Sequence, residues 1–417
     1  MLQPGVSGSK KNTRLRIAVY SGIIPATPFI ENLINVLIQN GHHVLLFGRK
    51  RGQYQSACNG RSMYYVPDNR IKVTLFAFFY WLRLAARRPR EIHKVYNAIR
   101  QGKGGLPSFF KGSVKIIPVI LSKPDVFHIQ WAKALPAWMF LKNFGVKIAL
   151  SLRGTHINYS PVTVPGLAEV YRVLFPHVDG FHAVSHTIAN VAANYGAKPE
   201  KTRIVYSYVK DKLIVRGRQK LNDQACWVAG RPLSVVSIGR HHWIKGYTYA
   251  IDAMRILIDR GCEVRYSIVA SGDPEECIFH IHDLGLTRVV TINDAAAHER
   301  VVEYIASADV LLLPSVEEGI ANVVLEAMAL GTVVVTTDCG GMREVVQDNS
   351  TGFIVPKRNS LAIADALEKI SKLSPPDRRQ IAEDAHNTIS ECHTRSAFES
   401  GIEQFYQLVV GGVKENS

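Results

Sequence analysis

Short apolar runs alternate along the chain with longer segments in which apolar residues recur every third or fourth position. Runs of the first kind are typical of buried strands, and the second pattern is typical of amphipathic helices. Strands are predicted at Leu15–Tyr20, Val44–Phe47, Val126–Gln130, Lys147–Leu152, Gly180–Val184, Leu233–Ile238, Val264–Ala270, Val289–Ile292, Val310–Pro314 and Thr332–Thr336. Helices are predicted at Phe29–Gln39, Asn322–Leu330 and about Ser396–Val410. This alternation predicts an α/β fold of parallel sheets covered by helices.

The chain has 417 residues, of which 47% are hydrophobic, and it is too long for a single core. We therefore expect two domains, at residues 1–207 and 232–395. The charged and irregular stretch 208–231 is the expected linker, and residues 396–417 are expected to carry a separate C-terminal helix.

Two glutamates flank the start of one predicted helix. Glu318 lies in the turn after a strand, and Glu326 lies about two helical turns further on. The backbone amides of Ile320, Ala321 and Asn322 lie at the helix start, where an anion is favoured. Two carboxylates beside an anion site suit a ligand with hydroxyl groups on both sides of a phosphate. A nucleotide sugar is such a ligand, with one glutamate for the sugar hydroxyls and the other for the ribose diol.

This region resembles the signature of retaining glycosyltransferases of family 4, which share the GT-B fold. The matching residues are Pro314, Ser315, Glu318, Gly319, Glu326, Ala327, Met328, Gly331, Gly340, Gly341 and Glu344. The block SIGRHHWIKGYTYAIDAM resembles the family's strand-to-helix cation loop through Gly239, Arg240, Lys245 and Gly246. The blocks KPDVFHIQW, SLRGTHI and VDGFHAVSHTIANVAANYGAKPEKTRIVY have the order and spacing of its N-terminal domain. The resemblance spans roughly residues 14 to 408.

The resemblance implies two Rossmann-like domains whose parallel sheets face a central cleft. The first domain would bind the acceptor, the second would bind the nucleotide-sugar donor, and the final helix would return to the first domain. The implied donor-binding residues are Gly22, Gly239, Arg240, Lys245, Glu318, Gly319, Ile320, Ala321, Asn322 and Glu326. Among them Arg240, Lys245 and Glu318 would be catalytic, the two cations at the diphosphate and the carboxylate on the transferred sugar.

The reaction implied by the resemblance is a retaining, hexosyltransferase-type transfer. In the family's proposed route the acceptor attacks from the side of the leaving group, and the departing diphosphate helps to take the acceptor proton. No second carboxylate presents itself as the nucleophile that a double displacement needs. The chain contains no Asp-x-Asp, and its six cysteines have no metal-ligand spacing. We therefore expect no metal and no other cofactor, since Arg240, Lys245 and the helix start supply the positive charge.

Three residues of the first half are candidates for acceptor binding. The family often has His at the position of Arg153 and Asp at the position of His156. Arg153 cannot act as a base because its guanidinium does not deprotonate, but it suits an anionic acceptor or the leaving phosphate. His156 is either a polar contact or a structural residue. His128, with Gln130 two positions later, looks like a one-histidine version of the family's paired pattern.

Positive charge is concentrated in the first half of the chain. Residues 1–210 hold 29 Lys and Arg against 7 Asp and Glu, and the remainder holds 21 against 28, which gives the net charge of +15. Within the basic half an aromatic and aliphatic run, Val73–Leu82, passes into several arginines. The run is too short to span a bilayer core of roughly 30 Å, so we expect an interfacial segment that contacts anionic lipid. The candidates for membrane contact are Trp81, Arg83, Arg87, Arg88 and Arg90. The alternative is a buried core helix followed by a solvated basic turn.

The polar N-terminus lacks the apolar segment of a signal peptide, and the cysteines form no C-x-x-C pair. We therefore expect a reduced, cytoplasmic protein that is peripheral on the inner face of the cell membrane. No recognised nucleic-acid module accompanies the basic half, so no nucleic-acid partner is expected.

The sequence thus predicts a transferase that moves a sugar from a nucleotide-diphosphate sugar to a glycan or lipid-linked glycan, in exopolysaccharide, capsule or lipopolysaccharide-type assembly. One alternative is a soluble transferase that acts on a small phosphorylated acceptor. A second alternative is a non-catalytic sensor or scaffold that binds nucleotide sugars, which Arg153 at the family's histidine position leaves open.

Overall fold

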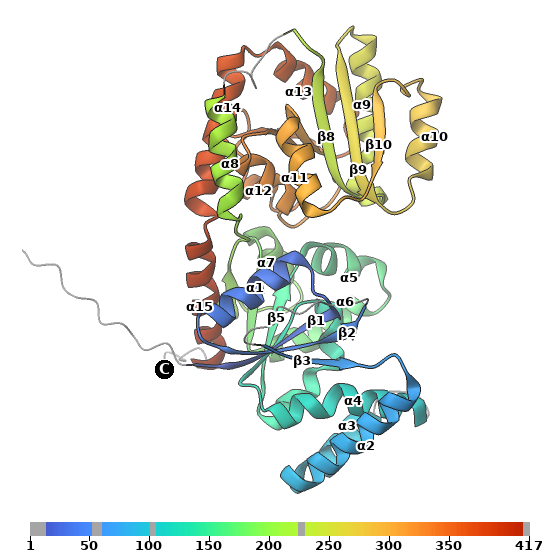
Figure 1. Ribbon diagram of the computed structural model, residues 1–417, viewed down its shortest axis with the longest axis vertical. Helices are drawn as coiled ribbons and strands as arrows, with labels where there is room; N and C mark the ends of the chain where they lie inside the picture. The colour runs from blue at the N-terminus through green and yellow to red at the C-terminus, as the bar shows by residue number, and fades with distance from the viewer. Residues whose placement is uncertain (1–13, 52–60, 101–105, 224–229, 412–417) are drawn as a thin grey trace, which may run out of the picture. The chain divides into compact units, whose positions relative to one another are not determined.

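The computed structural model describes residues 14–51, 61–100, 106–223 and 230–411, and the strands of these residues form two sheets (Figure 1). The first sheet has seven strands in the order β3-β2-β1-β4-β5-β6-β7, and the second has six in the order β10-β9-β8-β11-β12-β13. Every strand pair whose register is described is parallel. The predicted α/β fold with two Rossmann-like parallel sheets is confirmed.

The elements of the first sheet region are listed here in chain order: β1 (Arg16–Ile24), α1 (Pro28–Gln39), β2 (His43–Lys50), β3 (Arg61–Val66), α2 (Arg70–Arg87), α3 (Ile92–Arg100), α4 (Leu106–Ser122), β4 (Val126–Ile129), β5 (Lys147–Leu152), α5 (Ser160–Thr163), α6 (Leu167–Leu174), β6 (Gly180–Ala183), α7 (His186–Ala193) and β7 (Thr202–Ile204).

The remaining elements are α8 (Asp211–Asn222), β8 (Leu233–Arg240), α9 (Tyr247–Asp259), β9 (Val264–Ser271), α10 (Glu275–Asp283), β10 (Val290–Asp294), α11 (His298–Ser307), β11 (Val310–Leu313), α12 (Asn322–Ala329), β12 (Val333–Thr337), β13 (Phe353–Val355), α13 (Ser360–Lys372), α14 (Pro375–Cys392) and α15 (Arg395–Gly411).

Both faces of the second sheet are buried, as its continuous apolar strands require. Successive residues of β11 point to opposite faces, so Val310 and Leu312 pack in one core with α9 and α13. Leu311 and Leu313 pack in the other core, which α12 covers. Burial on both faces explains why β11 is apolar at every position. Because β8 and β11 pair in parallel, their carboxyl ends lie at the same edge of the sheet.

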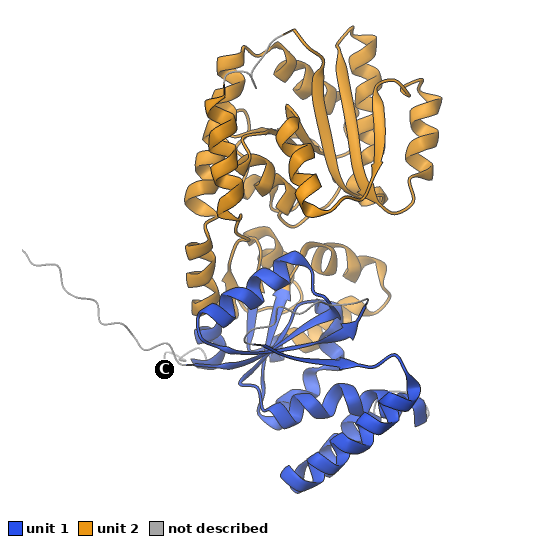
Figure 2. Cartoon of the chain, in the orientation of Figure 1, with its two compact units in different colours: residues 1–151, 176–181, 406–417 blue, residues 152–175, 182–405 orange. Residues whose placement is uncertain are grey.

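The chain forms two compact units, drawn in different colours in Figure 2. Unit 1 comprises residues 1–151, 176–181 and 406–417, and unit 2 comprises residues 152–175 and 182–405. The expected linker, residues 208–231, contains α8, whose Leu213 and Leu221 are buried in unit 2. The functional domain ranges inferred from the sequence stay a prediction.

Three helices form a layer beside the sheet in unit 1 (Figure 1). Helix α2 packs against α4 along a narrow buried seam made of Val73, Ala77 and Val114. The run Val73–Leu82, expected as an interfacial segment, lies within α2 and is helical throughout. Most of its large apolar side chains lie outside the seam.

Candidate functional site

Glu318 lies in the loop between β11 and α12, as predicted. Its carboxylate forms an ion pair with Lys245 and accepts a hydrogen bond of 2.9 Å from the Ser315 hydroxyl. The two loops are also joined through their backbones, because Val316 donates its N–H to the carbonyl of Ile244 at 2.8 Å. The structure therefore brings two of the three predicted catalytic residues together, and the third, Arg240, lies at the end of the neighbouring strand β8.

Glycine is required where these loops meet. Gly246 has a φ of +67°, and a Cβ there would collide with the carbonyl oxygen of Pro314. Gly340 has a φ of +52°, and a Cβ there would collide with the carbonyl oxygen of Glu318. The next residue, Gly341, donates its N–H to the Gly319 carbonyl at 2.7 Å. Gly340 and Gly341 therefore both support the loop that carries Glu318.

The amino end of α12 is open to an anion. Its N-cap residue is Ala321, which has no side-chain oxygen to accept hydrogen bonds from the first amides of the helix. The predicted anion-binding amides, those of Ile320, Ala321 and Asn322, therefore lie at a helix start without side-chain capping. The dipole of the helix adds partial positive charge there, which favours a phosphate group.

Glu326 lies in the middle of α12 and is largely buried. Burial raises the pKa of its carboxyl to about 7, and Lys210 opposes this shift. The His298 ring lies close by, with its Nε2 3.7 Å from the carboxylate. Burial lowers the pKa of His298, so the ring offers little positive charge near neutral pH. A carboxyl held in this state is typical of functional sites.

Arg240 ends strand β8 and is exposed. Within the described residues it forms no ion pair, so its guanidinium is available for a ligand. The preceding Gly239 lies against the hydroxyl of Tyr247 and the side chain of Lys245, and a Cβ at this position would come within 2.6 Å of that hydroxyl. Burial raises the pKa of Tyr247. The glycine therefore lets the cation loop fold back over the strand end.

The residues predicted in the first half lie in different surroundings. Gly22 lies in unit 1 and has a φ of +81°. A Cβ at this position would lie 3.3 Å from the Trp131 ring. His128 is fully buried in unit 1, where its ring nitrogens bond to the Tyr406 hydroxyl at 2.7 Å and the Ser151 hydroxyl at 3.0 Å. These contacts give His128 a structural environment in the core.

Arg153 and His156 belong to unit 2, Arg153 two residues before the π-helical turn Thr155–Tyr159 and His156 within it. Burial lowers the pKa of the Arg153 guanidinium to about 9. Between them Gly154 lies against the Glu318 loop, where a Cβ would come within 2.7 Å of the Gly319 nitrogen. The segment that carries Arg153 and His156 is therefore packed directly on the loop of Glu318.

Three of the membrane candidates have partners within the protein. The Trp81 indole donates to the Ser113 hydroxyl at 3.0 Å and stacks on a neighbouring phenylalanine, and Arg88 pairs with Glu91 at 2.7 Å. Arg83 lies over the Phe79 ring at 5.4 Å. Arg87 and Arg90 are exposed.

Sequence reasoning missed several partners of the predicted residues. The pairing of Lys245 with Glu318, the Ser315 hydroxyl and the proximity of His298 to Glu326 all depend on tertiary contacts. A further case is Glu344, which belongs to the matched motif. Its carboxylate accepts hydrogen bonds from the amides of His186 and Thr187 at the start of α7, both at 2.8 Å.

No group of three or more His, Cys, Asp or Glu in the described part of the chain is arranged to hold a metal ion. Cys262, Cys277, Cys339 and Cys392 are free thiols, and the other two cysteines of the sequence, Cys58 and Cys226, lie outside the described residues.

The two parallel sheets, together with the cation loop and the open helix start, define a glycosyltransferase of the GT-B class. The family model Glycosyltransferase Family 4 matches residues 26–212, and the model Glycosyl transferases group 1 matches residues 232–372. These ranges together cover most of the chain, which belongs to the family 4 glycosyltransferases.

Curated relatives agree with this assignment. The chain is 25% identical over 407 residues to WcaL of Salmonella typhimurium, a glycosyltransferase whose name assigns it to colanic acid biosynthesis. The match covers 91% of this chain and 96% of the relative. It is 33% identical to the amylovoran biosynthesis glycosyltransferase AmsK of Erwinia amylovora, but that match covers 34% of this chain and 37% of the relative.

Solved structures share the fold at low sequence identity. A sucrose-phosphate synthase from Thermosynechococcus elongatus has a TM-score of 0.69 and 19% identity, with 95% of this chain and all of that chain covered. HepE of Anabaena, solved with UDP-glucose, has a TM-score of 0.67 and 16% identity, with 94% of this chain and all of that chain covered. The expected GT-B fold is therefore confirmed.

Proposed function

We propose that this protein transfers a sugar, with retention of configuration, from a nucleotide-diphosphate sugar to a growing glycan or lipid-linked glycan in polysaccharide assembly. The observation that carries the donor assignment is the convergence of Lys245 and Glu318 beside the open amino end of α12. Arg240, at the end of the adjacent strand, completes a cationic edge. The names of WcaL and AmsK, which refer to exopolysaccharides, support the acceptor class.

Donor binding would use each part of this edge differently. The amides of Ile320, Ala321 and Asn322 and the two cations would hold the diphosphate, and charge-assisted contacts of this kind are strong. Glu326 would accept the ribose hydroxyls. When the diphosphate engages Lys245, the Glu318 carboxylate is released toward a hydroxyl of the transferred sugar.

Catalysis would rest on stabilising the leaving diphosphate and on positioning. The acceptor hydroxyl would attack from the leaving-group side, and its proton would pass to a diphosphate oxygen as the glycosidic bond to that oxygen breaks. The positive charge required comes from side chains and the helix start, so the proposal includes no metal.

Removal of each cation tests the donor assignment. Arg240→Ala and Lys245→Ala are expected to lower kcat/KM by about 100-fold or more, because each removes charge from the leaving group. Arg288→Ala, an exposed cation elsewhere in unit 2, is the matched control. Donors are screened by nucleoside diphosphate release, and NMR of the product reports its anomeric configuration. Wild-type turnover in both site variants contradicts the diphosphate assignment, and an inverted product contradicts retention.

We also propose that α2 attaches the protein to the inner face of the cell membrane. No helix among residues 14–51, 61–100, 106–223 and 230–411 is long and apolar enough to cross a bilayer. Large apolar side chains of α2 are instead exposed along its length, at Ile71, Leu75, Phe76, Phe78, Phe79 and Leu82. An exposed apolar surface of this size, with arginines at its carboxyl end, suits the headgroup layer of an anionic membrane.

Flotation with phosphatidylglycerol vesicles tests this attachment. Phe78 is 66% exposed in α2, and Phe279 is 71% exposed in α10 of unit 2, so the two form a matched pair. Phe78→Glu is expected to reduce the floated fraction, because burying a carboxylate in the interface is unfavourable, and Phe279→Glu is expected to leave it unchanged. Equal flotation of both variants contradicts the role of α2.

A further inference from the structure

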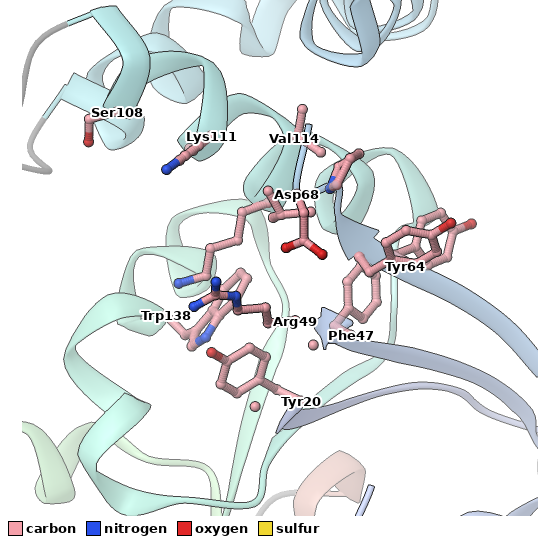
Figure 3. Close-up of a pocket in the computed structure, with 16 residues that line it drawn as sticks. Tyr20, Phe47, Arg49, Tyr64, Asp68, Ser108, Lys111, Val114 and Trp138 are labelled. Atoms are coloured by element: carbon pink, nitrogen blue, oxygen red, sulfur yellow. The ribbon is translucent and has the colours of Figure 1, made fainter. Parts of the chain in front are cut away.

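Unit 1 contains a pocket of about 500 Å³ that none of the predicted acceptor residues lines (Figure 3). It lies at the carboxyl ends of β1, β2 and β3, with α4 as its other wall, and reaches Gly22 in the last part of β1. Ligands of parallel α/β sheets bind at this edge of the sheet. Its size is within the usual range of small-molecule sites.

The pocket is rich in positive charge. Arg49, Lys111 and Lys115 line it against a single carboxylate, that of Asp68. In the described part of the chain none of these four side chains has an ion-pair partner. The Arg49 side chain and the Asp68 carboxylate both extend into the space between the strand ends and α4 (Figure 3). The excess of cations remains available to an anion from solution.

Lys115 is the most informative of these residues. Its ammonium lies 4.7 Å from the centre of the Trp138 ring and 5.7 Å from that of Tyr20. These cation–π contacts partly offset the loss of water, but burial still lowers the pKa of Lys115. A half-buried cation without a carboxylate partner is costly to the folded protein, and an anionic ligand would remove that cost.

Aromatic side chains form the rest of the lining. Tyr20 and Trp138 lie with ring centres 5.1 Å apart, and Phe47 stacks on Tyr64 at 4.8 Å. Burial raises the pKa of Tyr20, and the indole N–H of Trp138, which interacts with the Tyr20 hydroxyl, lowers it by a smaller amount. The pocket thus offers flat apolar surface and an excess of cations, which together suit a phosphate group joined to an apolar or sugar portion.

We propose that this pocket binds a phosphate group of the acceptor, held by Arg49, Lys111 and Lys115. The proposal rests on the proposed transferase function and specifies the acceptor as phosphorylated. The pocket lies between α4 and the segment that leads into α2, the helix proposed to lie in the membrane. A lipid-linked phosphate could therefore enter from the bilayer, whereas a soluble sugar phosphate would enter from water.

Binding of decyl phosphate to the full-length protein, measured by calorimetry below its micelle concentration, tests the proposal. Lys115→Met and Arg49→Gln are each expected to weaken binding about tenfold or more, because each removes a charge-assisted contact. Lys133→Met, an exposed cation of unit 1 outside the pocket, is expected to bind like wild type. The melting temperature of Lys115→Met should equal or exceed that of wild type, since the variant removes a half-buried charge that has no carboxylate partner.

The outcomes separate the sources of the phosphate. Tighter binding of decyl phosphate than of glucose 1-phosphate supports a lipid-linked acceptor, and the reverse order supports a soluble one. Wild-type affinity in both pocket variants, or no binding of either probe to wild type, overturns the proposal. Binding of a panel of nucleoside diphosphates, followed by thermal shift, reports on the donor site. Its retention in Lys115→Met shows that the variant is folded, and the absence of binding of every nucleoside diphosphate to wild type counts against the proposed transferase and not against the pocket.

Discussion

Glu326 provides a prediction whose size follows from the structure. Burial raises the pKa of its carboxyl from 4.5 to about 7, and neither Lys210 nor the His298 ring compensates fully. A carboxyl with a higher pKa in the folded state stabilises the protein below pH 4.5, and this contribution is lost as pH rises through 7. Above neutral pH the folded state therefore carries an unfavourable charge at Glu326. The difference between the two pKa values, at about 1.4 kcal/mol per pH unit, lowers the free energy of unfolding by about 3 kcal/mol.

The substitution Glu326→Gln keeps the shape of the side chain and removes its titration. Its stability relative to wild type is expected to rise by about 2–3 kcal/mol between pH 5 and pH 8. For a unit of this size this corresponds to a relative gain in Tm of about 5–10 °C. Thermal unfolding of both proteins across this range, followed by circular dichroism, measures the gain, because other titrating groups cancel in the difference.

Glu263→Gln, an exposed carboxyl in the same unit, controls for the loss of one negative charge. Its difference from wild type should change little with pH. A difference between Glu326→Gln and wild type that stays constant from pH 5 to pH 8 refutes the reasoning, because Glu326 would then be ionised throughout that range in the folded protein.

Two further predictions concern the framework of unit 2 and its pH dependence. Gly246→Ala is expected to lower the free energy of unfolding by about 3 kcal/mol or more, since the new methyl group meets the Pro314 carbonyl. Gly41→Ala, at a φ of +83° with open space around it, should lower it by about 1 kcal/mol. Urea unfolding compares the two variants, and equal losses of stability would contradict the packing argument. Burial raises the pKa of Glu344, but hydrogen bonds, first among them that from the Thr187 amide, outweigh this effect and leave the pKa lowered. Glu344→Gln should therefore lower the free energy of unfolding by about 1–2 kcal/mol at pH 7, and its difference from wild type should shrink as pH falls below 4.5. A loss of stability that does not depend on pH would exclude a role for the charged carboxylate as hydrogen-bond acceptor.

The fold was predictable because its strands are buried on both faces. A strand such as β11 must then be apolar at every position, and this pattern survives in the sequence without any knowledge of its neighbours. Edge strands carry a weaker signal. β3 has no fully buried residue, and the prediction omits it. The stretch 208–231 appears irregular because α8 buries only a few apolar residues between charged ones.

The local sequence pattern predicted one part of the candidate site, and the family resemblance added Arg240 and Lys245 from a distant segment. Glu318 and the start of α12 share one loop, so the strand–turn–helix pattern places them together. The pocket of unit 1 takes lining residues from three strand ends and from α4, and no local pattern connects them. His128 is a motif residue that the sequence suggests for acceptor binding, but in the structure it is buried in the core. Its hydrogen bond to Tyr406 joins residues 278 positions apart, which no local pattern predicts.

The ion pair between Lys245 and Glu318 joins residues 73 positions apart, and it alters the roles that the sequence suggests for each. From the sequence, Lys245 is expected to bind the diphosphate and Glu318 is expected to bind the sugar. In the structure each neutralises the other, and Ser315 fixes the carboxylate at 2.9 Å. A diphosphate that draws Lys245 away would leave Glu318 with an unpaired charge, which a sugar hydroxyl can then satisfy. Binding of the diphosphate and binding of the sugar are therefore expected to be coupled. A nucleoside diphosphate without a sugar would then leave the Glu318 carboxylate ready to accept a hydrogen bond from a sugar hydroxyl.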